Sequence, residues 1–373
     1  MKQHTVEAGS SDDTYGGNRF RSSCLSRLER RYGRGCSVKV KFSRNVPEAR
    51  IMSVLENGFD VDGQRYEFLA FSDSQLRERS CTFFATSPYL GIQDVISWLG
   101  DFSSITNTSK YAVRLGQCFS PTRPSIVLND WDFIVEEDIV RNGYEFTEGC
   151  GRISTAAAAQ VAALLHLKPV PSAFQIRFGE FKGVLVVDPS LVNVAVAFRK
   201  SQQKFVIHSR TEEQRTLEIL EFTKQTKAAN LNRQFLMILC ELGVSQSYFE
   251  QMMCNELRRK EQTGRSKSCL EMVLRLRDNL SIPVQRSRNL MGVADISEEL
   301  QEGEVFVQIH VNGKLRMLQG NVVVMKSPSL HLGDLRILKA VNVPNLSSLT
   351  NCIVFSTKGQ QPDFNAIAGS VSI

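Results

Sequence analysis

The sequence predicts a mixed α+β fold, in which strand regions and helical regions alternate along the chain. Apolar residues recur at every second position in FDVDGQRYEF (59–68) and in EVFVQIHV (304–311), which is the period of a strand. The segment ISTAAAAQVAALLHL (153–167) is long and rich in alanine and leucine, and this composition favours a helix. The predicted order is β, α, β, α, β. Because no unit of about 20–50 residues repeats, the sequence does not predict a solenoid.

The composition indicates a folded protein of two or three domains. The chain has 373 residues, of which 42% are hydrophobic and 23% are charged, so it can bury a large core. Lysine and arginine exceed aspartate and glutamate by 45 to 39, and the formal net charge of +6 permits a nucleic-acid partner without requiring one. The sequence has neither a secretory signal nor a run of about 18 apolar residues, so no membrane association is expected.

Cysteine usage indicates a reducing compartment. Nine cysteines are scattered without a CxxC pair, which argues against a structural zinc site. An odd number of cysteines without a signal peptide predicts free thiols, and therefore a cytoplasmic or nuclear protein.

The first part of the chain contains a basic cluster, and its apolar pattern predicts a hairpin followed by a helical region. The cluster SRLERRYGRGCSVKVKF (26–42) is interpreted as a solvated helix face that runs into a strand, with a nucleic-acid patch as the alternative. In the hairpin at 59–68, Asp62-Gly63 forms the turn, which needs positive φ. From about 94 to 120 the apolar period becomes helical.

Two strands are expected after the helix predicted for 153–167, whose N-cap is Ser154 or Thr155. The strand SAFQIRF (172–178) has its large apolar residues on one face and places Arg177 on the other. The segment GVLVVD (183–188) is apolar almost throughout, so it is predicted to be buried on both faces.

Residues 211–280 are predicted to be mostly helical. The segments 230–243 and 245–262 have apolar residues at helical spacing, and the first lies between an asparagine N-cap and a C-terminal glycine. The strand pattern resumes at 304–311, where His310 lies on the less apolar face and is expected at the surface.

A cysteine between two glycines precedes the predicted helix at 153–167. Cys150, flanked by Gly149 and Gly151, could be a nucleophile with a lowered pKa at a helix N-terminus. The glycines suit a tight turn with a small buried thiol equally well, and this second interpretation is favoured because the sequence identifies no nearby base. A cysteine-dependent enzyme that pairs Cys150 with His331 remains a minor alternative.

Two further segments combine charge with strand-forming residues. In FRKSQQKF (198–205), basic residues lie between two phenylalanines, a composition that suits contact with RNA phosphates and bases but also a solvated strand edge. In SLHLGDLRIL (329–338), His331, Asp334 and Arg336 surround Gly333, and an Asp–Arg pair at this spacing can brace a turn.

These pieces, taken in order, resemble the eukaryotic RNA-dependent RNA polymerases of RNA silencing. The resemblance covers about residues 37–370, and each piece alone is a weak signal. The matching segments are RIMSVLENGFDVDGQRYEFLAFSDSQLRERS (50–80), GDFSSITNTSKYAVRLGQCFS (100–120), RNGYEFTEGCGRIS (141–154), SAFQIRFGEFKGVLVVDPS (172–190), FRKSQQKF (198–205), LNRQFLMILCELGV (231–244), SRNLMGVAD (287–295), GEVFVQI (303–309), SPSLHLGDLRILKAV (327–341) and NCIVF (351–355).

The resemblance implies a core of two double-psi β-barrels joined by a helical connector. It implies the following division: a polar and basic segment at 1–36, a slab-like α+β region at 37–140, a complete first barrel at 141–208, the connector at 209–286 and a partial second barrel at 287–373.

The implied activity is templated addition of ribonucleotides to an RNA 3′ end, which makes double-stranded RNA or small-RNA precursors. RNA template and ribonucleoside triphosphates are the implied partners, Argonaute- and Dicer-type silencing proteins are candidate partners, and the implied cofactor is Mg²⁺ held by an aspartate loop. Lys182, Arg199, Lys204 and Arg336 are the implied RNA or nucleotide contacts. The segments implied to lie near the site contribute Gly149, Cys150, Gly151, His331, Gly333 and Asp334.

The resemblance also implies that this chain lacks the metal ligands. Relatives carry a Ser-Gly-Gly-Asp-Leu-Asp-Gly-Asp loop, and here Val371 and Ile373 occupy the first two aspartate positions. Apolar side chains cannot ligate Mg²⁺, so no metal site is expected and the chain alone is expected to be inactive. The alternative function is a non-catalytic RNA-binding or scaffold protein of the silencing machinery.

An incomplete second barrel is expected to lower the stability of the C-terminal part of the chain. The strands at 304–311 and 351–355 are expected to keep unpaired edges, which would make residues 291–373 the least stable part of the chain. Ser329, Leu332 and Lys200 also depart from residues usual in the family.

Overall fold

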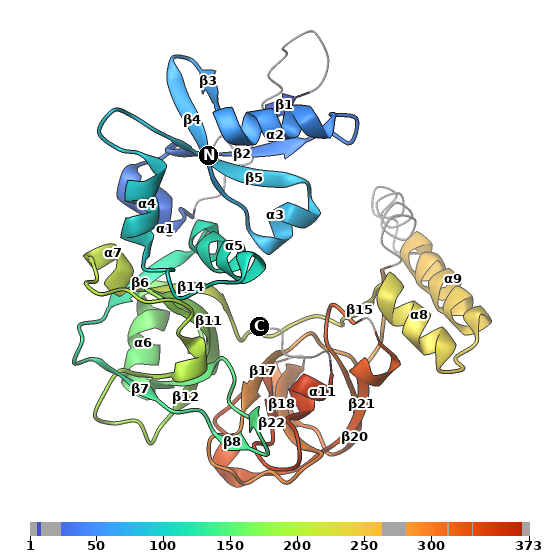
Figure 1. The fold of residues 1–373 in the computed structure, drawn as a ribbon. Coiled ribbons are helices and arrows are strands. Elements are labelled where there is room, and N and C mark those ends of the chain that lie inside the picture. Colours follow the sequence, from blue (N-terminus) through green and yellow to red (C-terminus); the bar gives the residue numbers. More distant parts are fainter. Residues whose placement is uncertain (1–5, 9–23, 263–280, 312, 330, 368–373) are drawn as a thin grey trace.

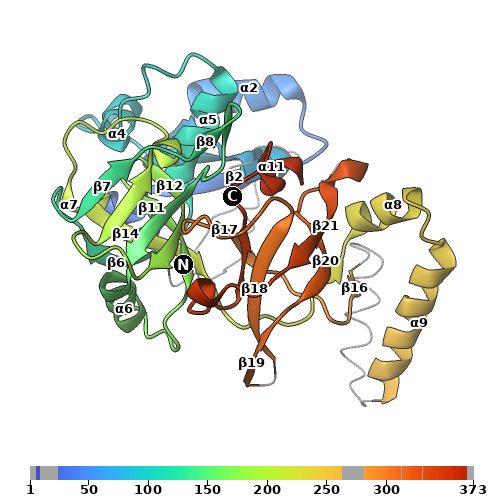
Figure 2. The same cartoon turned by 90° about the horizontal axis from the view of Figure 1, so that it is seen from below.

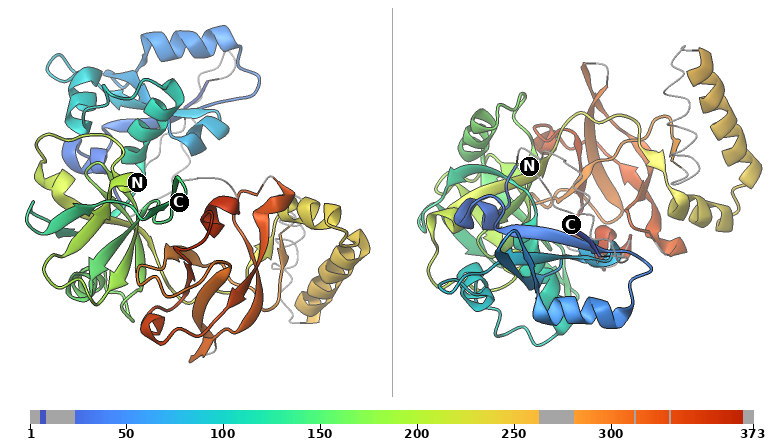
Figure 3. Two further views of the ribbon diagram at one scale, coloured as in Figure 1. Left: turned by 60° about the horizontal axis from the view of Figure 1, so that its bottom comes forward. Right: turned by 90° about the horizontal axis from the view of Figure 1, so that it is seen from above.

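The computed structural model describes residues 6–8, 24–262, 281–311, 313–329 and 331–367, and it confirms the mixed α+β prediction (Figure 1). A five-stranded, a seven-stranded and a six-stranded sheet follow one another along the chain. The N-terminal part lies against the seven-stranded sheet, and the six-stranded sheet lies beside it (Figures 1 and 3).

The N-terminal part is a five-stranded sheet with helices packed on it. Its strand order is β1-β2-β5-β4-β3. The predicted hairpin is confirmed: β3 and β4 pair across Asp62 and Gly63, whose φ angles are 50° and 78°. The elements are β1 (Val6–Ala8), α1 (Arg27–Tyr32), β2 (Ser37–Phe42), α2 (Glu48–Asn57), β3 (Phe59–Val61), β4 (Gln64–Ala70), α3 (Asp73–Arg77), β5 (Ser80–Ala85), α4 (Ile92–Leu99), α5 (Thr108–Gly116) and η1 (Gln117–Phe119).

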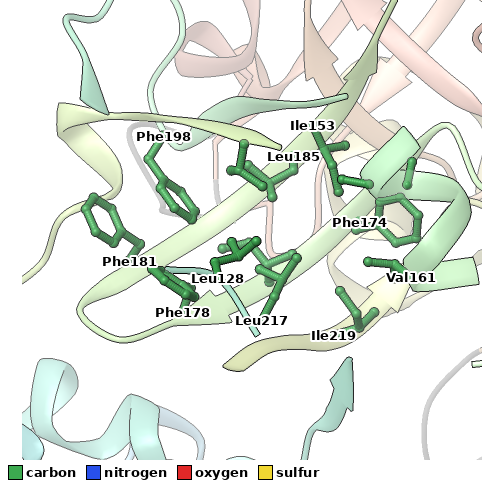
Figure 4. Close-up of a cluster of buried hydrophobic side chains, with 14 residues drawn as sticks. Leu128, Ile153, Val161, Phe174, Phe178, Phe181, Leu185, Phe198, Leu217 and Ile219 are labelled. Atoms are coloured by element: carbon green, nitrogen blue, oxygen red, sulfur yellow. The ribbon is translucent and has the colours of Figure 1, made fainter. Parts of the chain in front are cut away.

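The seven-stranded sheet has the order β6-β14-β11-β12-β10-β13-β7 and encloses an apolar core (Figure 4). Phe178, Phe181 and Phe198 stack within this core, with ring centroids 4.3–6.2 Å apart. The elements are β6 (Arg123–Val127), β7 (Phe133–Glu136), β8 (Val140–Arg141), β9 (Tyr144–Glu145), β10 (Cys150–Ser154), α6 (Thr155–Leu164), β11 (Ala173–Phe178), β12 (Phe181–Asp188), β13 (Val196–Arg199), η2 (Lys200–Gln202), α7 (Glu212–Arg215) and β14 (Thr216–Phe222).

A helical pair stands beside the six-stranded sheet, on the side away from the seven-stranded sheet (Figures 1 and 2). Helix α8 (Arg233–Glu241) begins at its N-cap Asn232, and Gly243 follows it with a φ of 94°, as predicted. The other elements are β15 (Asn230–Leu231), α9 (Gln246–Gln262) and β16 (Ile282–Pro283).

The six-stranded sheet has the order β17-β22-β18-β21-β20, with β19 paired to β18. The elements are β17 (Met291–Ala294), β18 (Glu304–Val311), β19 (Lys314–Met317), β20 (Gly320–Met325), η3 (Leu332–Asp334), β21 (Leu335–Ala340), η4 (Pro344–Leu346), β22 (Cys352–Phe355) and α11 (Asp363–Ala366).

Five strands of each of the two larger sheets share one topology. We number these strands 1 to 5 in chain order, which gives β7, β10, β11, β12 and β13 in the first sheet and β17, β18, β20, β21 and β22 in the second. Across each sheet the strands then lie in the order 1-5-2-4-3. The directions of pairing also agree, since both sheets alternate parallel, antiparallel, parallel and antiparallel pairs along this order. The two halves of this region therefore repeat one strand arrangement, although the sequence shows no repeat.

Several predicted boundaries differ from the structure. The helix predicted for 153–167 begins only at Thr155, because Cys150–Ser154 is a buried strand between β12 and β13; its N-cap is Ser154, one of the two predicted. The prediction that residues 211–280 are mostly helical fails near residue 216. There β14 (Thr216–Phe222) pairs with β11, so the seven-stranded sheet continues beyond residue 208. The predicted helical residues 263–280 lie outside the described residues.

The burial predictions fail where a second layer covers a strand. Arg177 is buried because its face of β11 is turned toward Arg27 and Cys118 of the N-terminal part. Phe306 and Gln308, on the supposedly polar face of β18, are also buried, because apolar cores lie on both faces of this strand.

The expectation of unpaired edges at 304–311 and 351–355 is wrong. Strand β18 pairs with β22, β21 and β19, and β22 pairs with β17 and β18. Both segments are therefore interior to the six-stranded sheet.

Candidate functional site

A short loop at 145–150 lies where the seven-stranded and six-stranded sheets meet. Gly149 in the loop has a φ of 70°, and close backbone approach explains two glycines of the strands beside it: a Cβ on Gly183 would lie 2.2 Å from the carbonyl oxygen of Gly149, and one on Gly151 would lie 2.5 Å from that of Ala197. The side-chain amide of Gln202 donates to the Gly149 and Val184 carbonyls at 3.2 and 3.1 Å. The glycines thus permit tight packing, as the favoured interpretation of the motif predicts.

The carboxylate of Asp138 fixes this loop to η2. It accepts hydrogen bonds from the Thr147 hydroxyl at 2.9 Å and from the Ser201 amide and hydroxyl at 2.9 and 2.7 Å. The amide of Gly149 in turn donates to the Ser201 hydroxyl oxygen at 3.0 Å. The loop is therefore held by side chains from two segments about 60 residues apart along the chain.

Half-buried lysines gather around the loop. Burial lowers the pKa of Lys204, and the carboxylates of Glu148, Glu145 and Asp138 oppose that shift. Burial also lowers the pKa of Lys326, after β20, and Glu148 again opposes the shift. Glu148 therefore faces lysines from both sheets, and this side of the loop is a cluster of mixed charge.

The third lysine, Lys182, lines a small pocket of about 40 Å³ between the sheets. Glu148 lies on the same wall, and the six-stranded sheet contributes the opposite wall. The lining residues are Phe146, Thr147, Glu148, Gly149, Cys150, Lys182, Gly183, Val184, Gly292, Val293, Ala294, Phe355 and Phe364.

The four residues predicted to contact RNA or nucleotide do not all lie at this loop. Lys182 and Lys204 belong to the site, whereas the buried Arg199 donates to the carbonyl of Glu137 at 2.7 Å and pairs with Glu136 at 3.4 Å. Arg199 is therefore engaged within the sheet. Arg336 is exposed on β21, where its charge acts on Asp363 of α11.

The segment around His331 forms a turn held by His331 and Asp334, whereas the Asp334–Arg336 pair stays a prediction. The ring Nδ1 of His331 accepts a hydrogen bond from the Gly333 amide at 3.0 Å, and the His331 amide donates to the Asp334 carboxylate at 3.0 Å. His331 is exposed, while Asp334 is buried at the start of β21.

Cys150 has the properties of a structural thiol. Its Sγ accepts a hydrogen bond from the Ala294 amide at 3.4 Å, which links the two sheets. Burial raises the pKa of the Cys150 thiol to about 11, so it is protonated at neutral pH. This argues against the cysteine-dependent alternative.

Nothing in the described part of the chain forms a metal centre. Across these residues there is no group of three or more His, Cys, Asp or Glu side chains that could hold a metal ion. Val371 and Ile373, the residues at the expected aspartate positions, lie outside the described residues. Within the described ranges, no helix has the length and apolar character to cross a membrane.

Sequence reasoning missed Asp138, Glu148 and Lys326. They come from three separate segments and share no spacing pattern, so only the pairing of strands brings them together. The one local signal was the pair of glycines around Cys150.

Comparisons with known proteins find relatives that share much of this sequence. A family model described as RNA dependent RNA polymerase matches residues 19–275 and 265–370. The rice (Oryza sativa subsp. japonica) protein "Probable RNA-dependent RNA polymerase 1" is 35% identical over 368 residues, which cover 86% of this chain and 49% of the rice protein. "RNA-dependent RNA polymerase 1" of Arabidopsis thaliana is also 35% identical, over 86% of this chain and 33% of its own length.

A solved structure has a similar fold. The RNA-dependent RNA polymerase QDE-1 from Thielavia terrestris superposes with a TM-score of 0.79 at 21% identity, over 93% of this chain and 49% of that one. The chain thus spans about half, or less, of the length of each of these three proteins.

Proposed function

Because this chain belongs to the RNA-dependent RNA polymerase family, we propose that it forms the RNA-holding core of a silencing polymerase. In this proposal the protein takes part in templated addition of ribonucleotides, with RNA template and ribonucleoside triphosphates as its ligands. The observation that carries the proposal is the gathering of Lys182, Lys204 and Lys326 around one loop between two sheets that share a five-strand topology.

The repeated strand order supports two β-barrels of one type. In each sheet the five shared strands form alternating parallel and antiparallel pairs, and the fifth of these strands in chain order is inserted between the first and the second. We assign both to the double-psi β-barrel, with Cys150 and its neighbours on the face where the two barrels meet.

The lysines suit phosphate binding in the space between the barrels. Ammonium groups contact RNA phosphates through charge, and a half-buried position strengthens that attraction compared with a fully solvated one. Glu148 limits the net charge while RNA is absent, since it faces two of the three lysines. Arg336, on the second barrel, would extend the contact along the backbone.

The described residues do not fit the Mg²⁺ that the family implies. They provide no group of three oxygen, nitrogen or sulfur ligands of the required kind. The positions that resemble the aspartate loop hold Val371 and Ile373, which have no ligand atoms. We therefore assign no metal-dependent step to this chain, and we propose that it does not polymerise RNA alone.

The alternative function is RNA binding or scaffolding without catalysis in the silencing machinery. The valine and isoleucine at the expected ligand positions favour this alternative for the chain as given. If the chain belongs to the silencing machinery, its proposed partners are Argonaute- and Dicer-type proteins of the cytoplasm or nucleus.

Filter binding of a single-stranded RNA at several salt concentrations tests the proposed RNA contact. Lys182→Gln, Lys204→Gln, Lys326→Gln and Arg336→Gln should each lower the slope of log affinity against log salt by about 0.7 per lost phosphate contact. Lys339→Gln is the matched control, because Lys339 is 65% exposed and pairs with Glu304 on the same sheet as Arg336. A salt-independent affinity, or equal slopes for all variants, would contradict the proposal.

A further inference from the structure

A second, larger groove of about 740 Å³ opens where the N-terminal part meets the seven-stranded sheet. None of its lining residues belongs to the loop site. They come from α4, the segment after it, α5 and the segment 207–214, and they are Ile96, Ser97, Trp98, Gly100, Asp101, Phe102, Ser103, Ile105, Tyr111, Ile207, His208, Ser209, Thr211 and Gln214.

Backbone pairing and aromatic packing hold the two walls of this groove together. Asp101 and Val206 exchange two backbone hydrogen bonds, at 2.7 and 3.2 Å. The ring of Phe102 lies 4.6 Å from that of Phe205 and 5.8 Å from that of Tyr111, measured between centroids. The groove is therefore shaped by fixed elements of both parts, and its volume falls in the range of ligand-binding sites.

The polar chemistry of the groove centres on one carboxylate. Asp101 accepts a hydrogen bond from the Ser103 amide at 2.8 Å, and its other oxygen lies 3.2 Å from Nε2 of His208. Hydrogen bonds from Ser103 and His208 lower the pKa of Asp101 to about 2, so this side chain is ionised at neutral pH. Its side chain is 39% exposed and that of His208 is 78% exposed, so a ligand can reach both.

The lining favours a cation over an anion. It contains no lysine or arginine, one ionised carboxylate beside His208, and the aromatic side chains of Trp98, Phe102 and Tyr111. Outside the lining, the guanidinium of Arg31 lies 5.9 Å from the centroid of the Trp98 ring, so a cation already occupies a position beside this indole. Aromatic faces and a carboxylate attract ammonium and guanidinium groups and repel phosphates. In addition, the buried indole N–H of Trp98, a residue of the lining, has no hydrogen-bond acceptor within the described part of the chain.

We propose that this groove binds an arginine or lysine side chain on an apolar peptide segment of a partner protein. The cation would pair with Asp101 and lie beside Tyr111, and the flanking apolar residues would cover Ile96 and Ile105, which are half-buried. This inference does not rest on the proposed RNA contact, because the two sites share no residue.

Tryptophan fluorescence can report binding directly. The sequence has two tryptophans, so Trp131→Phe leaves Trp98 in the groove as the single reporter. The probe is the peptide acetyl-Leu-Arg-Leu-amide, and its citrulline counterpart removes the charge while keeping the shape. The arginine peptide should change the emission saturably and bind more tightly than the citrulline peptide by about 1.4-fold to fivefold, the range for a partly exposed ion pair.

Variants in the same background locate the contact. Asp101→Asn keeps an acceptor for the Ser103 amide and should reduce binding of the arginine peptide by the same factor. Asp130→Asn is the matched control: this carboxylate is 75% exposed, pairs with Arg210 and does not line the groove, so binding should not change.

Three results would overturn the inference. They are the absence of a saturable signal at millimolar peptide, equal binding of the arginine and citrulline peptides, and tighter binding of an oligouridylate than of the peptide. The peptide comparison needs no variant beyond the reporter background, so it stands even if Asp101→Asn does not fold.

Discussion

Arg27 of α1 and Glu218 of β14 form a buried ion pair across 191 positions of the chain, with Nε and Nη2 donating to the two carboxylate oxygens at 3.2 and 3.0 Å. Arg30 pairs with the same carboxylate, and Nη1 of Arg27 donates to the Gly179 carbonyl at 2.7 Å. The basic cluster at 26–42 was interpreted from the sequence as a solvated helix face, and this interpretation is therefore wrong. These arginines join the N-terminal part to the seven-stranded sheet.

Replacing Arg27 should destabilise the protein strongly. Arg27→Met leaves Glu218 buried with a single partner, and the expected loss is about 3 kcal/mol in the free energy of unfolding. Urea denaturation followed by circular dichroism measures it. Arg31→Met, on the same helix, should cost less than about 1 kcal/mol because its pair with Glu213 is 3.6 Å long and partly exposed. Equal losses for the two variants would show that the ion pair does not contribute as described.

The thiols should separate into reactive and protected classes. Burial raises the pKa of Cys150 to about 11 and that of Cys352 to about 12, so both stay protonated until the pH approaches those values, whereas Cys240 and Cys254 are exposed. Iodoacetamide at pH 8 should modify Cys240 and Cys254 in the folded protein and leave Cys150 and Cys352 unmodified, as measured by peptide mass spectrometry. Rapid alkylation of Cys150 in the native state would revive the nucleophile interpretation.

A single buried carboxylate organises the turn after β17. Asp295 is fully buried and accepts hydrogen bonds from the amides of Ser297, Glu299 and Leu300 and from the Ser297 hydroxyl, at 2.6–3.0 Å. Asp295→Ala leaves these donors without an acceptor and should lower the free energy of unfolding by about 3 kcal/mol.

Asp60→Ala is the control for this carboxylate. Asp60 is 65% exposed and makes one ion pair, with Arg65, so its loss should stay below about 1 kcal/mol in the same urea titration. A comparable loss at both positions would contradict the assigned role of Asp295.

Local features of the fold could be predicted from the sequence. The Asp62-Gly63 turn was predicted correctly, and so was a helix within 230–243 that has an asparagine N-cap, because neighbouring residues determine a turn type and an N-cap. The helix starts after Asn232, since Asn230 and Leu231 form a short strand. The strand at 183–188 was predicted as buried on both faces, and its residues Gly183 to Val186 are buried.

Features that depend on distant residues could not be predicted. The burial of Arg27 depends on Glu218, and the position of Lys326 beside Glu148 depends on how two sheets meet. The same reason explains the error at 304–311 and 351–355, since a sequence does not state which strands will flank a given strand. The repeated 1-5-2-4-3 order likewise has no counterpart in the sequence, because strand order is set by crossovers rather than by repeated residues.

The last prediction concerns catalysis. The purified chain of 373 residues should bind RNA in a salt-dependent way but should incorporate no nucleotide on any template, with either Mg²⁺ or Mn²⁺. The resemblance implies aspartates at positions 371 and 373, and Val371 and Ile373 offer no oxygen ligands there, so on this premise the charge that develops during phosphoryl transfer would lack a bound cation to stabilise it. Binding without stabilisation of the transition state yields no turnover. Primer extension with labelled nucleotides measures this, and template-dependent incorporation by this chain alone would mean that its catalytic carboxylates lie elsewhere.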